Sequence, residues 1–115
     1  MKLAGSYIQY GGGFNKDNVD KNDIYNAIEY LKKTDDEHAD FWIGVYGEES
    51  EEKVLEINKW FETFLHLNDE KNTFYATKLD DFEQIKNLCE LLVDGKIGEV
   101  EKKMIEYRSK KTQTD

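Results

Sequence analysis

The clearest regular segment of the chain is DFWIGVYG, whose side chains alternate between the two sides of an extended strand. Phe41, Ile43 and Val45 share one side, whereas Trp42 and Tyr46 share the other. The first side is entirely apolar, which suits burial beneath helices. We therefore expect a strand at the centre of a sheet, with Phe41, Ile43 and Val45 in the core.

A helix is predicted in the segment DKNDIYNAIEYLKK. Asp20 suits the N-cap, and Asp23, three residues later, takes the place of the usual Glu of a capping box. Apolar residues then recur at the i, i+3, i+4 and i+7 spacing that places them on one side of a helix: Ile24, Ala27, Ile28 and Leu31.

Helical spacing returns in DDFEQIKNLCELLVDG. Asp80 and Glu83 are placed for a capping box, and Gly95 suits the C-cap. A last helix is predicted near residues 99–110, and residues 109–115 are expected to form a polar, frayed tail. The helical residues predicted to join the core are Ile28, Leu31, Ile85, Leu88 and Leu92.

The segments SYIQY and TFYATKL favour strands. KVLEINKWFETFLHL fits both the alternation of strands and the spacing of a helix, and we predict two strands there. The fold class expected is a single α+β domain over residues 1–108. It has an antiparallel or mixed sheet of about four to five strands, with an N-terminal helix and one or two C-terminal helices packed on it.

The segment YGGGF, which we expect to join the first strand to the helix, could be mistaken for a phosphate-binding loop. It matches neither G-x-x-x-x-G-K-[ST] nor G-x-G-x-x-G. Asp17, Asp20 and Asp23 follow it and disfavour an anion. The glycines are therefore predicted to allow positive φ angles or a close backbone approach. The alternative is a flexible contact loop that uses Tyr10 and Phe14.

Composition indicates a globular chain without a membrane segment. Its 115 residues, 38% of them hydrophobic, suffice for one core. No run approaches the roughly 20 apolar residues that span a bilayer, and MKLAGSYIQYGGG lacks the apolar stretch of a signal peptide. The single cysteine, Cys89, excludes an internal disulfide and fits a reducing compartment. We expect a cytoplasmic protein that makes no contact with a membrane.

Charge narrows the choice of partner. The net charge is −9; residues 91–115 hold six basic and five acidic groups, so residues 1–90 carry −10. Binding to nucleic acid needs clustered Lys and Arg that neutralise backbone phosphates. We therefore expect no direct binding to nucleic acid, and a protein partner with a basic surface instead.

No motif predicts catalysis. The segment DDEHAD surrounds His38 with possible oxygen ligands, but it lacks the order of an EF-hand, so a solvated loop is expected. Cys89 falls on the apolar side of its helix, and His66 lies on a predicted strand. With 25 acidic residues, neighbouring carboxylates arise by chance. We expect no enzyme activity, no catalytic residue, no metal and no cofactor.

Exposed aromatic residues suggest a binding surface. If Phe41 faces the core, Trp42 and Tyr46 face the other side of the sheet, where Trp60 and Tyr75 are candidates to join them. Aromatic anchors with a charged rim are typical of protein-binding surfaces. The alternative is that the C-terminal helix covers them. The partner-binding residues predicted are Trp42, Tyr46, Glu48, Glu49, Glu51, Glu52, Trp60 and Tyr75.

The order of elements resembles that of small cytoplasmic immunity proteins of bacterial polymorphic toxin systems. The resemblance covers residues 7–98: a strand ending in YGGGF, a helix with NAIEYL, the strand FWIGVYG, then VLEI and later strands, and a closing helix followed by LLVDG. It implies an antitoxin-type protein that binds a cognate toxin domain, often a basic nuclease, and occludes its active site. It carries over no catalytic residue.

Two other functions stay open. An acidic nucleic-acid mimic that inhibits a DNA- or RNA-binding protein would need carboxylates spaced like phosphates. A small ligand-binding domain would need a concave pocket with converging polar groups.

Overall fold

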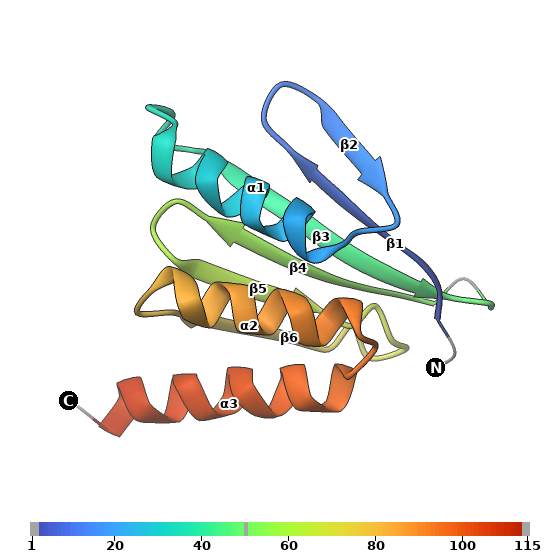
Figure 1. Cartoon of the computed structure of the whole chain (residues 1–115). Coiled ribbons are helices and arrows are strands. Elements are labelled where there is room, and N and C mark those ends of the chain that lie inside the picture. Colours follow the sequence, from blue (N-terminus) through green and yellow to red (C-terminus); the bar gives the residue numbers. More distant parts are fainter. Residues whose placement is uncertain (1–2, 50, 114–115) are drawn as a thin grey trace.

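The computed structural model describes residues 3–49 and 51–113, which form one α+β domain with a six-stranded antiparallel sheet and three helices (Figure 1). The order of strands in the sheet is β2-β1-β3-β4-β5-β6. The elements are β1 (Leu3–Tyr10), β2 (Phe14–Asp17), α1 (Lys21–Lys33), β3 (Asp40–Gly47), β4 (Glu52–Asn58), β5 (Glu62–His66), β6 (Phe74–Lys78), α2 (Phe82–Val93) and α3 (Ile97–Gln113).

The sheet has more strands than predicted because YGGGF is the turn of a β-hairpin and does not lead directly into a helix. Tyr10 pairs with Phe14 across β1 and β2, and their ring centroids lie 4.6 Å apart. Gly11, Gly12 and Gly13 have φ angles of 23, 69 and 88°. These positive values confirm the prediction that the glycines allow positive φ angles, which other residues rarely adopt. The strand that was missed, β2, has only four residues, FNKD, and lies at the edge of the sheet.

The predicted core is confirmed. β3 lies between β1 and β4, and Phe41, Ile43 and Val45 are fully buried. The ambiguous segment is indeed two strands, β4 and β5. The helical residues predicted for the core all belong to the same buried cluster: Ile28, Leu31, Ile85, Leu88 and Leu92.

Helix caps follow the prediction in α1 and depart from it in α2. Asp20 and Asp23 form a capping box, in which each carboxylate accepts a hydrogen bond from the other's backbone N–H at 2.9 Å. In α2 the N-cap is Asp81 instead of Asp80. Its carboxylate accepts from the backbone N–H of Gln84 at 2.9 Å, while the Gln84 side chain accepts from the Asp80 N–H. The cap therefore lies one residue later than predicted.

The end of α2 and the course of α3 complete the C-terminal region. The C-cap of α2 is Asp94, one residue before the predicted Gly95, and Gly95 follows it with a positive φ of 79°. Helix α3 begins at Ile97 and runs to Gln113, so residues 109–113, expected in the tail, are helical. Residues 114–115 lie outside the described residues.

All three helices lie on one face of the sheet. Figure 1 shows α1 in front of β3, α2 in front of β5 and β6, and α3 beside α2 along the β6 edge. The hydroxyl of Tyr75 on β6 donates to Glu101 of α3 at 3.2 Å, which ties α3 to this face. The opposite face carries no helix in the described part of the chain. Within residues 3–49 and 51–113, no helix is long and apolar enough to cross a membrane.

Candidate functional site

The sheet face opposite the helices, here called the open face, presents side chains from all six strands. Its membership follows from the register, because paired residues of antiparallel strands point to the same side. Two adjacent rows cross its centre: Gln9, Trp42, Glu56, Phe64 and Ala76 in the first, and Tyr7, Gly44, Val54, His66 and Phe74 in the second.

Four rings form the aromatic centre of the open face: Trp42, Phe64, His66 and Phe74. The His66 ring lies 6.1 Å from Trp42 and 5.1 Å from Phe74, and the Phe64 and Phe74 rings are 5.8 Å apart. Trp42 is 37% exposed and Phe74 is 50% exposed. A contiguous aromatic surface of this kind is typical of a protein-binding site.

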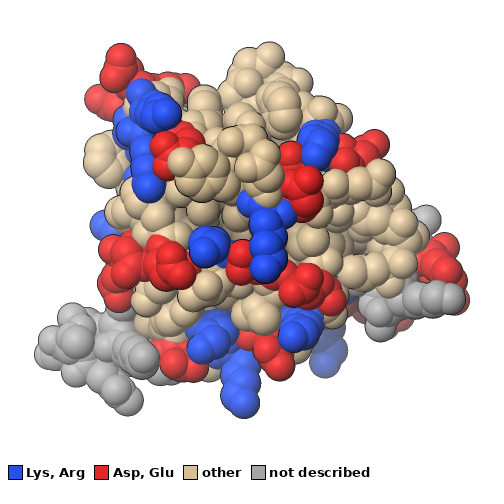
Figure 2. All heavy atoms as spheres, viewed as in Figure 1, with Lys and Arg blue, Asp and Glu red and all other residues tan. Residues whose placement is uncertain are grey.

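Acidic side chains surround and interrupt this centre. The charged residues that the register places on the open face are five acids and one lysine: Asp17, Asp40, Glu52, Glu56, Glu62 and Lys78. Figure 2 shows the helix side, where lysine and acidic side chains are intermixed. These residues give the open face an excess of negative charge, which suits a basic partner.

Glu56 occupies the middle of the aromatic centre. Trp42 and Phe64 flank it in register on the two neighbouring strands. Burial, together with a hydrogen bond and charge repulsion from Asp40, raises the pKa of Glu56 to about 7. The nearest ring nitrogen of His66 lies 3.9 Å away, too far for a hydrogen bond, and has no hydrogen-bond partner. Near neutral pH the carboxyl group of Glu56 is therefore protonated for part of the time.

Two tyrosines on the open face rest on glycines of the neighbouring strand. The ring of Tyr7 lies over Gly44, and that of Tyr46 lies over Gly5. Such cross-strand pairs fill the space left by a glycine within a sheet. Burial, followed by the charge of Glu52 and a hydrogen bond to it, raises the pKa of Tyr7 to about 12. Tyr7 is therefore a neutral hydrogen-bond donor at physiological pH.

Trp42 separates two hollows on the open face. One, of about 400 Å³, lies toward the β1–β2 hairpin and includes Asp40. The other, of about 290 Å³, lies toward β4 and β5 and includes Glu52 and His66. Each hollow combines the indole of Trp42 with a carboxylate, an arrangement suited to cationic side chains.

The structure brings together some of the residues predicted to bind a partner. Trp42, Tyr46 and Glu52 share the open face. Three others lie next to Tyr46 in the β3–β4 turn, where the first two are exposed and the last is half-buried: Glu48, Glu49 and Glu51.

Two predicted members lie elsewhere. Tyr75 pairs with Leu65 and lies on the helix-covered face. In TFYATKL it is Phe74, and not Tyr75, that points to the open face. Trp60 is 53% exposed in the β4–β5 turn, where its indole N–H donates to the carbonyl oxygen of Glu37 at 3.1 Å. Helix α3 contacts Tyr75 but packs beside α2 and leaves Trp42 exposed, so the alternative that this helix shields the aromatic residues holds for Tyr75 and not for Trp42.

Most residues of the aromatic centre, and the carboxylates beside it, were not predicted from the sequence. Phe64, His66 and Phe74 alternate with core residues of β5 and β6. The face of the sheet on which they lie could therefore have been predicted from the sequence. Only the register of β4 against β3 and β5 brings Glu56 among them. No local pattern specifies that register.

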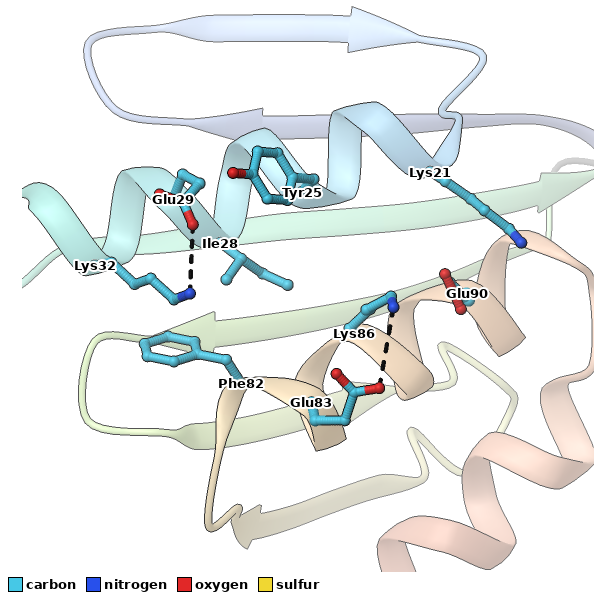
Figure 3. Close-up of a pocket in the computed structure, with 9 residues that line it drawn as sticks. All are labelled: Lys21, Tyr25, Ile28, Glu29, Lys32, Phe82, Glu83, Lys86 and Glu90. Carbon is cyan, nitrogen blue, oxygen red and sulfur yellow. Dashed lines mark hydrogen bonds and ion pairs between the residues drawn. The ribbon is translucent and has the colours of Figure 1, made fainter.

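A second concavity lies on the helix side, between α1 and α2 (Figure 3). It encloses about 500 Å³, with Ile28 pointing from α1 toward α2 and Phe82 below Lys32. Two ion pairs are drawn there, Lys32 with Glu29 at 3.3 Å and Lys86 with Glu83 at 4.0 Å, while Lys21 and Glu90 also line the groove. Four of the charged side chains of this groove are therefore already paired within the protein.

Residues with catalytic or metal-binding chemistry are dispersed. Among the residues that the structure describes, no group of three or more His, Cys, Asp or Glu side chains converges on a possible metal position. Cys89 is fully buried in α2, and this burial raises the pKa of its thiol. His38 lies in the exposed α1–β3 turn, where its backbone N–H donates to Asp36.

Comparison of the chain with protein-family models, with curated proteins and with solved structures finds no match in any of the three.

Proposed function

We propose that this chain is an immunity-type protein that binds a basic toxin domain through its open face and neutralises it by stoichiometric occlusion. The observation that supports the proposal most is the aromatic centre, set on a helix-free face among five acids and one lysine. Opposite charge speeds encounter, while desolvated aromatic side chains slow dissociation. The resemblance in element order suggests a toxin, with a nuclease-like basic surface, as the partner.

The open face favours binding over catalysis. Glu56 has a pKa near the value that suits a general acid or base. However, the hollows next to it are surface depressions, whereas a catalytic site normally encloses its substrate. We assign Glu56 to recognition, since a partly buried carboxyl group amid aromatic rings discriminates strongly between charged and neutral partners.

A role as a small ligand-binding domain is the second candidate, favoured by the groove of about 500 Å³ between α1 and α2. A ligand there would lie against Tyr25 and Phe82, which line it. Tyr25→Ala would then abolish binding of that ligand and leave the open face intact. Because two lysine–glutamate pairs of the groove already satisfy each other, this candidate has less support.

The proposal is tested by capture with three matched baits. The unmodified chain, Trp42→Ala and Tyr25→Ala are immobilised, and the proteins retained from the native host are identified by mass spectrometry. A basic protein retained by the unmodified chain and by Tyr25→Ala, but lost with Trp42→Ala, supports binding through the open face. Equal retention by all three baits contradicts it.

The inhibitory role is then tested on the captured partner. Immunity function requires that partner to be toxic, with its activity abolished at a one-to-one ratio. A partner that is instead a DNA- or RNA-binding protein, and is released by added nucleic acid, indicates the acidic mimic. A small molecule turned over by the purified chain would contradict both inhibitory functions.

A further inference from the structure

The hollow between Trp42 and the β1–β2 hairpin combines several kinds of polar group with aromatic residues, since Tyr10 and Phe14 line it together with Trp42. Gln9 is paired with Trp42 on one side and with Asn15 on the other, so these three side chains lie in a row. Asp40 precedes Trp42 by two residues on β3 and therefore points to the same face. All four line this hollow of about 400 Å³.

Trp42 leaves the hollow side of its indole available to a ligand. His66, on β5, lies on the other side of β3 from this hollow and is nearly parallel to the indole, with an angle of 16° between the rings. The hollow lies on the β1 side and includes neither His66 nor Glu56. A group entering it would meet the indole, the carboxylate of Asp40 and two side-chain amides.

This set of groups selects a guanidinium group. An anion would be repelled by Asp40, and an apolar group would leave that carboxylate without a counter-charge. A guanidinium group is planar, stacks on aromatic rings, and donates in a fork to a carboxylate while its remaining N–H groups reach amide oxygens. A lysine ammonium group is a strongly hydrated point charge and matches this geometry less well. We infer that the hollow receives an arginine side chain of the protein partner, stacked on Trp42 and paired with Asp40.

Binding of this arginine should release a proton from Glu56. Desolvation and the neighbouring Asp40 raise the pKa of Glu56 to about 7, so Glu56 holds a proton that it can donate to Asp40. The ionisable groups facing Glu56 are Asp40 on β3 and His66 on β5; Glu62, farther along β5, accepts a hydrogen bond from Asn58 at 3.1 Å. A guanidinium group paired with Asp40 would take the place of the Glu56 proton at that carboxylate and would favour the charged form of Glu56, so the proton of Glu56 would leave. Arginine binding should therefore strengthen as pH rises.

The inference rests on the proposed function, but it can be tested on the isolated chain. The probe is N-acetyl-arginine N-methylamide, an arginine with uncharged ends. N-acetyl-citrulline N-methylamide, which has nearly the same shape without the charge, is the control, and the corresponding capped lysine tests selectivity. Nuclear magnetic resonance follows the indole N–H signals of Trp42 and Trp60, and the carboxyl carbon of Glu56 as pH is changed.

We expect the arginine probe to shift the Trp42 signal, to leave Trp60 unchanged, and to lower the titration midpoint of Glu56. Its affinity should rise about tenfold between about pH 6 and pH 8, as release of one proton with a pKa near 7 requires. Asp40→Asn should abolish the shift of Trp42. Glu52→Gln, which removes a charge from the other hollow beside Trp42, should retain it.

Three results would overturn the assignment: no response of Trp42 to the arginine probe, equal responses to capped arginine and capped lysine, or equal binding by Asp40→Asn and the unmodified chain. An affinity that rises with pH equally in Glu56→Gln would overturn the proton coupling. These results leave the proposed function standing if Trp42→Ala still loses the captured partner. If Trp42→Ala keeps that partner, the proposed function fails whatever the probe does.

Discussion

Tyr7 and Gly44 face each other across β1 and β3, and a Cβ atom added to Gly44 would lie 2.5 Å from the Tyr7 ring. Gly44→Ala should therefore displace the ring and lower the free energy of unfolding by about 1 to 3 kcal/mol, as overpacking does elsewhere. Chemical denaturation measures this loss. Gly98→Ala is the control, because a Cβ atom there meets no atom within 4 Å and α3 should be unharmed or slightly stabilised.

Ile43 reports on the core beneath the open face. It is fully buried on β3, opposite Ile8 and Leu55. Ile43→Ala should lower the free energy of unfolding by about 2 to 5 kcal/mol, the range found for other large-to-small core substitutions. A loss below about 0.5 kcal/mol in denaturant titration would mean that Ile43 is not a core residue.

Glu56 should make stability depend on pH. Its pKa of about 7 in the folded chain exceeds the ordinary value of 4.5, so the folded state holds the proton more tightly than the unfolded state. The stability it contributes is complete below about pH 4.5 and is lost as pH rises toward 7. Glu56→Gln keeps a donor for Asp40 but does not ionise.

Between about pH 5 and pH 8, the unfolding free energy of Glu56→Gln should rise by about 1 to 2 kcal/mol relative to that of the unmodified chain. This is less than the full pKa difference would give, because water still reaches the carboxyl group. Denaturant titrations at several pH values give this difference. Glu62→Gln, at an exposed carboxylate of the same face, is the matched control. A pH-independent gap between Glu56→Gln and the unmodified chain would contradict the raised pKa of Glu56.

The acidic turn between β3 and β4 should act on encounter with the partner. Changing Glu48, Glu49, Glu51 and Glu52 to Gln should lower the association rate and flatten its dependence on salt, because screened charges act mainly at long range. The dissociation rate should change less. Binding kinetics with the captured partner at two ionic strengths measure both. An association rate that is unaffected at low salt would contradict electrostatic steering.

Much of the fold could be predicted from the sequence because its signals are local. Alternation in DFWIGVYG identified β3, and the spacing of Ile24, Ala27, Ile28 and Leu31 identified the buried side of α1. Strand β2 was not predicted because FNKD has neither alternating apolar and polar residues nor β-branched residues. Without that strand, the glycine turn was assigned to the wrong connection.

The candidate site depends more on non-local structure. Trp42 and Tyr46 could be placed because they alternate with obvious core residues. Tyr75 was misplaced because Phe74 and Tyr75 are both aromatic, and only pairing with β5 decides which of them faces the helices. The contact between Asp40 and Glu56 likewise arises from strand register, which composition cannot specify.

The central claim, that a basic protein binds on the open face around Trp42, is tested most directly by comparing two tryptophans. Both are exposed, but Trp42 lies in the aromatic centre and Trp60 in the β4–β5 turn. The measurement is the dissociation constant of the captured partner for Trp42→Ala and Trp60→Ala, with folding checked by circular dichroism. We expect Trp42→Ala to weaken binding by about 2 kcal/mol or more, roughly 30-fold, and Trp60→Ala to leave it unchanged. Equal affinities for the two variants, or a larger loss in Trp60→Ala, would contradict the claim.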